Sequence, residues 1–155
     1  MKHLEFEHLL PMTLDEAWTF FASPANLNLI TPDDLDIKIL DTLPDQMYQG
    51  LMIRYKIKPL LNISLDWVTE ITIIKNKEYF IDEQRKGPYR IWHHEHHFKV
   101  VDGGVLMTDK LYYDIGMSFI GTIAGALWVD KQVQKIFTYR KTKLNELFRA
   151  KPQSR

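Results

Sequence analysis

Apolar and polar residues alternate through the middle of this 155-residue chain, and this alternation limits the fold more than any other feature. A period of two residues is typical of a strand with one buried and one exposed face. Only short polar or glycine-containing segments interrupt the pattern, and they predict turns. The predicted strands cover residues 35–40, 51–58, 63–74, 78–86, 89–101 and 105–115. Six consecutive strands with short connections predict one antiparallel sheet.

The two ends of the chain add a seventh strand and helices. Residues 3–10 also alternate and predict a first strand. Thr13 stands three residues before Glu16 and ahead of an apolar run, a capping box that predicts a short helix, with a second short helix within 24–32. Residues 122–151 carry apolar side chains at helical spacing and contain no proline, so they predict one long amphipathic helix.

This order of elements predicts an α+β fold. We expect a seven-stranded curved antiparallel sheet wrapped around the long C-terminal helix, with two short helices after the first strand. Low-complexity or linker-like sequence is absent before the last few residues, so we expect a single ligand-binding domain over 1–150 and a tail over 151–155.

Composition excludes several classes of function. Lys and Arg total 20 and Asp and Glu total 20, without long runs of either sign, so nucleic acid is not expected as a partner. The chain has no cysteine, which excludes disulfides and thiolate chemistry. The N-terminus lacks the apolar core of a signal peptide, and no apolar run reaches membrane-spanning length. We therefore expect a soluble, cytoplasmic protein without membrane insertion; no sequence signal indicates its oligomeric state.

Turn positions give a register for the central strands. We take 76–77 and 103–104 as two-residue hairpin turns and 86–89 as the turn between them. The predicted cross-strand pairs are Ile73–Phe80, Ile71–Asp82, Thr69–Gln84, Asp82–His94, Gln84–Trp92, Phe80–His96, His94–Tyr113, His96–Leu111 and Phe98–Asp109.

This register separates the sheet into two chemically different faces. The face predicted to be inner carries Leu65, Trp67, Thr69, Ile71, Ile73, Phe80, Asp82, Gln84, Trp92, His94, His96, Phe98, Met107, Asp109, Leu111 and Tyr113. The face predicted to be outer carries Asp66, Glu70, Glu83, Arg85, His93, Glu95, His97, Lys99 and Lys110. A one-residue slip would bury all these charges, so the histidines at 93–97 are predicted to split between the faces.

Three segments carry a resemblance to a known family. Residues 80–98 read FIDEQRKGPYRIWHHEHHF, 107–116 read MTDKLYYDIG and 136–144 read IFTYRKTKL. They match the pattern F-x-D-x-Q, G-P-[FY], W-x-H-x-H-x-F, T-D and I-F-x-Y-R. The chain thereby resembles the START and birch-pollen-allergen (SRPBCC) superfamily, in its ligand-binding, polyketide-cyclase-like branch. The resemblance implies a helix-grip fold around an internal cavity for a hydrophobic or amphipathic small molecule. Arg140, in the matched Tyr-Arg pair, is interpreted as forming a structural ion pair.

The polar residues on the inner face have two interpretations. They could be a satisfied core network, in which Asp82 accepts a hydrogen bond from His94 and Gln84 bridges to Thr69. They could instead face a cavity between the sheet and the C-terminal helix and orient the head group of an apolar ligand. Such a ligand would be held by Trp67, Trp92, Phe98, Met107 and aliphatic residues of the long helix, the usual composition of a pocket. The candidate ligand-binding residues are Tyr55, Trp67, Thr69, Asp82, Gln84, Trp92, His94, His96, Phe98, Met107, Asp109 and Tyr113.

Two sharper hypotheses use the same residues. His94 and His96, with Asp82 or Asp109 across the sheet, could form a metal site with two imidazoles and a carboxylate. We expect no metal and no other cofactor, because only two imidazoles face inward and the aspartates are better placed to orient them. A His94–Asp82 acid/base pair, with Tyr113 or Gln84 on a carbonyl, would instead suit a cyclase or dehydratase. We favour a binding protein over an enzyme. The outer His93, Glu95 and His97 are interpreted as a solvated strand face.

Overall fold

The computed structural model of the protein describes residues 1–60, 63–116 and 123–148. The strands are β1 (Lys2–Leu10), β2 (Lys38–Ile39), β3 (Met52–Leu60), β4 (Ile63–Lys75), β5 (Tyr79–Lys86), β6 (Ile91–Val101) and β7 (Gly104–Asp114). The α-helices are α1 (Leu14–Phe21) and α2 (Ile123–Leu147), and the short 3₁₀-helices are η1 (Pro24–Ile30) and η2 (Asp33–Leu35). The predicted tail over 151–155 lies outside the described residues.

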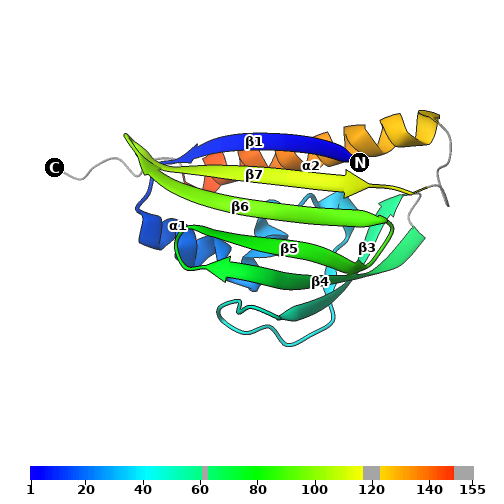
Figure 1. Ribbon diagram of the computed structural model, residues 1–155, viewed down its shortest axis with the longest axis horizontal. Helices are drawn as coiled ribbons and strands as arrows, with labels where there is room; N and C mark the ends of the chain where they lie inside the picture. The colour runs from blue at the N-terminus through cyan, green and yellow to red at the C-terminus, as the bar shows by residue number, and fades with distance from the viewer. Residues whose placement is uncertain (61–62, 117–122, 149–155) are drawn as a thin grey trace.

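The predicted seven-stranded antiparallel sheet is confirmed. Its strands lie in the order β1-β7-β6-β5-β4-β3-β2, so the first strand pairs with the last (Figure 1). The strand predicted over 35–40 is much shorter than expected. Leu35 belongs to η2, Asp36 caps this helix in the left-handed conformation, and only Lys38–Ile39 pair with β3. None of the described helices is long and apolar enough to cross a membrane.

Helices cover the inner face of the sheet in two places. α2 packs Val129, Val133 and Phe137 against Leu111 and Tyr113 of β7. α1 begins at the predicted capping box, in which Thr13 and Glu16 each accept a hydrogen bond from the other's backbone N–H. At this end of the sheet, the core contains Trp18, Phe21, Phe80, Phe98 and Met107.

The hairpin between β4 and β5 differs from the prediction. Its turn has a third residue, with Lys77 at φ 60°, so Lys75 pairs with Tyr79 and Ile73 with Ile81. A β-bulge between Ile71 and Ile73 then restores the predicted pairs Ile71–Asp82 and Thr69–Gln84. The prediction that Ile73 faces inward is therefore wrong. Ile73 is 42 % exposed, and Ile74 packs into the core in its place.

The pairing of β6 with β7 differs from the prediction: each β6 residue lies opposite a β7 residue two positions earlier than predicted. The turn between the two strands is Asp102–Gly103, so His94 lies opposite Leu111 and His96 opposite Asp109. A displacement of two leaves every side chain on its predicted face. It also brings the Asp109 carboxylate alongside the two inner histidines.

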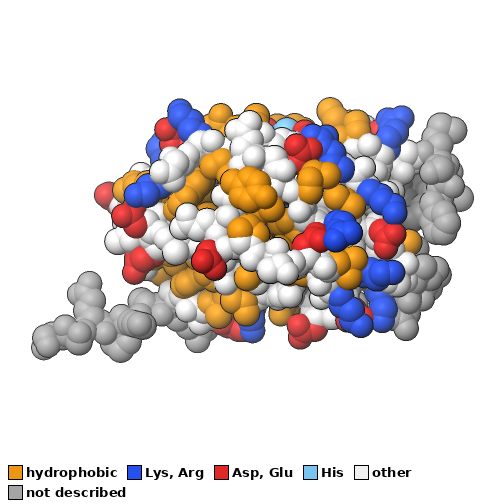
Figure 2. All heavy atoms as spheres, turned by 90° about the horizontal axis from the view of Figure 1, so that it is seen from below, with side chains coloured by type: hydrophobic (Ala, Val, Ile, Leu, Met, Phe, Trp, Pro, Cys, Tyr) orange, Lys and Arg blue, Asp and Glu red, His pale blue; other side chains and the backbone are white. Residues whose placement is uncertain are grey.

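Acidic and basic side chains are interspersed on the described part of the lower face in Figure 2, where they surround hydrophobic side chains. Exposed Leu40, Tyr48 and Met52 come from the segment that leads from β2 into β3. This face therefore carries no large field of one sign.

Two glycines at the hairpin between β6 and β7 generate a stability prediction. Gly104 has φ 144°, and a Cβ there would stand 2.0 Å from the backbone oxygen of Leu10 on the neighbouring β1 strand. Gly103 has φ 87°, but its added Cβ would meet only the Leu9 side chain, at 3.8 Å. We expect Gly103→Ala to cost about 1 to 2 kcal/mol through backbone strain. Gly104→Ala should cost about 1 to 3 kcal/mol more, because β1 must move. Urea unfolding measures both, and equal losses would contradict the close approach.

Candidate functional site

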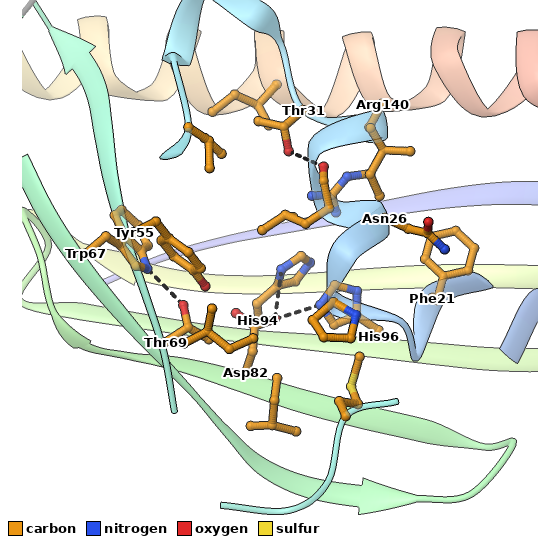
Figure 3. A pocket seen from close by; sticks show the side chains of 18 of the residues that line it. Phe21, Asn26, Thr31, Tyr55, Trp67, Thr69, Asp82, His94, His96 and Arg140 are labelled. Atoms are coloured by element: carbon orange, nitrogen blue, oxygen red, sulfur yellow. Dashed lines mark hydrogen bonds and ion pairs between the residues drawn. The ribbon is translucent and has the colours of Figure 1, made fainter. Parts of the chain in front are cut away.

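A pocket of about 200 Å³ lies between the inner face of the sheet and the helices (Figure 3). Engineered apolar cavities of about 150 Å³ admit benzene, so this space is large enough for a small organic group. Its wall is mostly apolar and comes from several elements, including β3 and β4 on one side and η1 and α2 on the other. Representative lining residues are Leu27, Ile30, Ile53, Ile57, Ile71, Phe80, Ile136 and Phe137.

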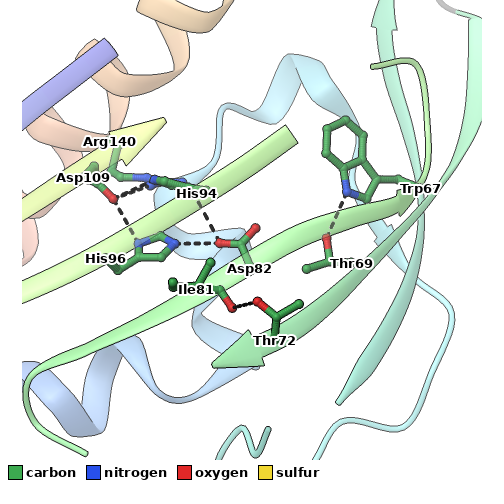
Figure 4. A network of polar contacts seen from close by, with 9 residues as sticks. All are labelled: Trp67, Thr69, Thr72, Ile81, Asp82, His94, His96, Asp109 and Arg140. Atoms are coloured by element: carbon green, nitrogen blue, oxygen red, sulfur yellow. Dashed lines mark hydrogen bonds and ion pairs between the residues drawn. The ribbon is translucent and has the colours of Figure 1, made fainter. Parts of the chain in front are cut away.

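One wall of this pocket is strongly polar. We call Asp82, His94, His96 and Asp109 the His–Asp cluster (Figure 4). His94 Nε2 lies 2.9 Å from Asp109 Oδ1, and His96 Nε2 lies 2.7 Å from Asp82 Oδ2. Two further contacts complete the arrangement: His94 Nδ1 is 3.5 Å from Asp82 Oδ2, and His96 Nδ1 is 2.9 Å from Asp109 Oδ1. The last distance is short, but its direction does not suit a hydrogen bond, so we interpret the contact as electrostatic.

The sheet register assembles the cluster. His94 and His96 are two residues apart on β6 and therefore face the same side. Asp82 lies directly opposite His94 on β5, as predicted, and Asp109 lies opposite His96 on β7. Each aspartate makes its hydrogen bond to a histidine diagonally, Asp82 with His96 and Asp109 with His94. The hydrogen bond expected between His94 and Asp82 is therefore replaced by a longer contact.

Burial works against charge in the cluster, and the neighbouring groups decide which side chains are ionised. Burial alone would raise the pKa of Asp82 and of Asp109. The contacts with His94 and His96 outweigh it, so both carboxyl groups have a lowered pKa. Burial and the neighbouring His96 lower the pKa of His94. Burial also opposes charge on His96, but contacts with Asp109 and Asp82 raise its pKa. These shifts favour two carboxylates, a neutral His94 and a charged His96.

Arg140 brings a guanidinium from α2 to the same wall. It is 8 % exposed, and its Nη1 lies 3.6 Å from Asp109 Oδ1, which is the ion pair expected for this residue. The guanidinium carbon lies 5.0 Å from the centre of the Phe137 ring. Nε and Nη1 make no hydrogen bond to another described residue. Arg140 thus supplies positive charge beside Asp109 while retaining hydrogen-bonding capacity.

The other two histidines of the 93–97 run lie on the outer face. His93 Nδ1 is 2.8 Å from Glu83 and His97 Nε2 is 2.7 Å from Glu95. Both rings are about one-third exposed, whereas His94 and His96 are 4 % and 7 % exposed. The predicted split of the histidine run between the two faces is confirmed.

The structure brings many of the candidate site residues to the pocket and leaves others elsewhere. Those that line the pocket are Tyr55, Trp67, Thr69, Asp82, Trp92, His94 and His96. Asp109 stands behind the two imidazoles. Phe98 and Met107 pack in the core beneath α1. The Tyr113 hydroxyl donates to Asp130 on α2 at 2.5 Å.

Gln84 is also away from the pocket. Its Nε2 donates to the backbone oxygen of Tyr89 at 2.6 Å, and its Oε1 accepts from the Tyr89 N–H at 3.3 Å. The pairing of β5 with β6 ends at Glu83–His93, so the predicted pair Gln84–Trp92 does not form. The proposed bridge from Gln84 to Thr69 is wrong, and Thr69 accepts from Trp67 Nε1 at 2.9 Å instead.

Sequence reasoning expected aliphatic residues of the long helix at the pocket without naming them, and it missed the part of the wall near η1. The wall outside the sheet includes Phe21, Asn26, Leu27 and Thr31 near η1, and Ile136, Phe137 and Arg140 on α2. The helical spacing of Ile136, Phe137 and Arg140 was the available signal, because residues three or four apart share one helix face. The docking of η1 had no comparable sequence signal.

Comparison with known proteins supports the fold. Neither a protein-family model nor a curated protein sequence matches the chain. Among solved structures, protein Ms6760 from Mycobacterium smegmatis is similar with a TM-score of 0.67, 16 % identity and coverage of 96 % of this chain and 91 % of the other. Ara h 8.0201 is similar with a TM-score of 0.59, 13 % identity and coverage of 94 % and 98 %. StfQ, a di-domain ARO/CYC from the steffimycin biosynthetic pathway, is similar over half of its length. The TM-score is 0.68, the identity is 10 %, and the match covers 94 % of this chain and 50 % of StfQ.

These likenesses extend over almost the whole chain at low identity, so they show the fold alone. The chain has a helix-grip fold, and this fold is similar to those of Ara h 8.0201 and StfQ.

The central position of Asp109 can be tested by its stability contribution. Asp109→Asn removes the charge that faces His94, His96 and Arg140, and removal of one partner from a buried ion pair costs about 3 kcal/mol or more. Asp66→Asn is the matched control, because Asp66 is 48 % exposed and pairs with Lys86 on the surface. We expect the control to lose less than about 1 kcal/mol in urea unfolding. Similar losses for the two variants would show that the cluster contributes no more than a surface ion pair.

Proposed function

We propose that this protein binds a small hydrophobic or amphipathic molecule in the pocket between the sheet and the C-terminal helix. The observation that carries the proposal is the combination of a mostly apolar wall with the His–Asp cluster in one pocket. Small-molecule sites commonly have this composition, in which apolar contacts give affinity and a few polar groups fix orientation.

The lining suggests how such a molecule would be oriented. Its apolar part would contact Trp67, Trp92 and the aliphatic side chains of β3 and η1, because all of these line the pocket. The two indoles meet edge to face with their centres 5.3 Å apart. Its polar part would face Asp82, His96 and the Arg140 guanidinium. A fully apolar molecule would leave that end without new hydrogen-bonding partners, so an amphipathic molecule fits the lining better.

The unfavourable free energy of burying the charged groups of the polar wall supports this proposal. Replacement of buried ion pairs by well-packed apolar residues is often neutral or stabilising. A chain under selection for stability alone would have little reason to keep two carboxylates, two imidazoles and a guanidinium together. The likeness to Ara h 8.0201 and StfQ supports the proposal only through the shared fold.

A second candidate function is acid/base catalysis of the cyclase or dehydratase type in the same pocket. The favouring observation is that Asp109 contacts Nε2 of His94, which would orient its imidazole as an aspartate orients a catalytic histidine. The acid/base pair would then be His94 with Asp109 rather than His94 with Asp82. Catalysis would require a substrate atom within hydrogen-bond reach of His94 Nδ1.

Binding can be tested with tryptophan emission and thermal stability. Trp67 and Trp92 line the pocket, so a variant with Trp18→Phe and Trp128→Phe would report from these two indoles. We expect at least one of a fatty acid, a sterol and a polycyclic aromatic compound to change the emission saturably. The same compound should add about 2.7 kcal/mol to the unfolding free energy at a hundred times its dissociation constant.

A matched pair of substitutions locates the binding. Ile136→Phe adds volume inside the pocket and should weaken binding, whereas Ile73→Phe adds the same volume on an exposed strand position and should leave it unchanged. If none of the compounds changes either emission or melting, or if the two substitutions act alike, the proposal is wrong.

A further inference from the structure

We propose that Asp82, His94 and His96 form a binding site for one divalent transition-metal ion at the polar wall of the pocket. This site lies at the polar wall that the polar part of an organic molecule would face, but metal binding does not depend on such a molecule. Each residue presents one ligand atom, a carboxylate oxygen or an imidazole nitrogen, and these three atoms all lie within 4.8 Å of one another. Two imidazoles and one carboxylate are a recurrent ligand set for iron and zinc.

The distances suit coordination after small side-chain rotations. Asp82 Oδ2 lies 2.7 Å from His96 Nε2 and 3.5 Å from His94 Nδ1. Bonds of about 2.0 to 2.1 Å to a common metal place neighbouring ligand atoms roughly 2.9 to 3.4 Å apart for octahedral to tetrahedral angles. One of these separations lies just below this range and the other just above it, and the third is at most 4.8 Å, so small side-chain rotations could bring the three atoms around one ion.

Asp109 provides the outer support that metal-binding histidines usually have. Its Oδ1 lies 2.9 Å from His94 Nε2 and 2.9 Å from His96 Nδ1, which are the ring nitrogens turned away from Asp82. A carboxylate at these nitrogens favours protons there and leaves a lone pair on each nitrogen that faces Asp82. One aspartate would thus act as a ligand, and the other would orient His94 by a hydrogen bond and favour a proton on His96 Nδ1 by an electrostatic contact.

The charge of the two carboxylates must be balanced either by a proton on His96, which the contacts within the cluster favour, or by a cation that displaces this proton. With neutral imidazoles, the carboxylates of Asp82 and Asp109 face a single buried guanidinium, that of Arg140. The surrounding residues are largely apolar, and an uncompensated negative charge in such surroundings is costly. A divalent ion would compensate it. A proton on His96 is the alternative source of positive charge.

The three ligands belong to the pocket wall, so the remaining coordination positions would face the pocket (Figure 3). An ion with three protein ligands keeps at least one position for water or an exogenous donor. This inference reverses the expectation from sequence that no metal binds. That expectation treated both aspartates as orienting groups, whereas the structure separates their roles.

Cobalt binding tests the site directly. Full-length protein without a histidine tag would be freed of metal by chelator dialysis and titrated with Co²⁺, with visible absorption as the readout and Zn²⁺ as competitor. We expect saturable binding of one equivalent, lost in His94→Ala and in the nearly isosteric Asp82→Asn. Asp109→Asn should weaken binding by about 10- to 100-fold, because it retains all three ligands but loses their orienting partner.

The outer histidines supply the matched control. His93→Ala and His97→Ala remove the same side-chain type from the same strand, each directly next to a proposed ligand, and should bind Co²⁺ as the wild type does. Circular dichroism would establish that each variant is folded.

Three outcomes would overturn the metal site. These are no saturable binding by the wild type at millimolar Co²⁺ or Zn²⁺, unchanged binding by folded Asp82→Asn, and loss of binding in the outer-histidine controls. The first would favour the protonated cluster. Organic-probe binding by the metal-free protein is measured separately, so failure of the metal site would leave the proposed pocket function standing.

Discussion

The Asp109 carboxylate is the contact on which the interior of this protein depends. It lies against two imidazoles of β6 and the guanidinium of Arg140 on α2, so one buried charge joins the sheet to the C-terminal helix. An isolated carboxylate at this depth would be strongly unfavourable. The strand pairing of β7 with β6 and the seating of α2 must therefore both place a positive or hydrogen-bonding group beside it. Apolar packing tolerates small displacements of α2 better than this contact does.

The same contact determines what the pocket offers. Because Asp109 occupies the far side of the two imidazoles, their other nitrogens lie toward Asp82 at the pocket wall. The remaining wall is mostly aliphatic and aromatic, drawn from β3, β4, η1 and α2. The pocket therefore combines a large apolar surface with a compact polar end of fixed geometry. This combination underlies both the proposed organic ligand and the proposed metal ion, which would share the polar end of the pocket.

The sequence predicted the faces of the sheet better than its pairs. Alternation assigns His94 and His96 inward whatever the turn, and the two-residue displacement at Asp102–Gly103 preserved those faces. The turn at Lys77 has one residue more than predicted, and Ile73 therefore faces outward. The bulge between Ile71 and Ile73 restores the predicted register for the rest of β4. The diagonal choice of partners in the His–Asp cluster and the role of Gln84 at the Tyr89 turn depend on side-chain geometry. The pocket wall from η1 depends on tertiary docking, which local alternation does not encode.

The central claim is that the apolar wall and the His–Asp cluster act together as one binding site. Nuclear magnetic resonance tests it most directly, through the indole N–H signals of Trp67 and Trp92 and the imidazole nitrogen signals of His94 and His96 during titration with an amphipathic compound. The account predicts that both sets of signals shift along one binding curve, while those of the outer His93 and His97 stay in place. Indole shifts without any response from His94 and His96, or no response from either set across a chemically varied panel, would contradict it.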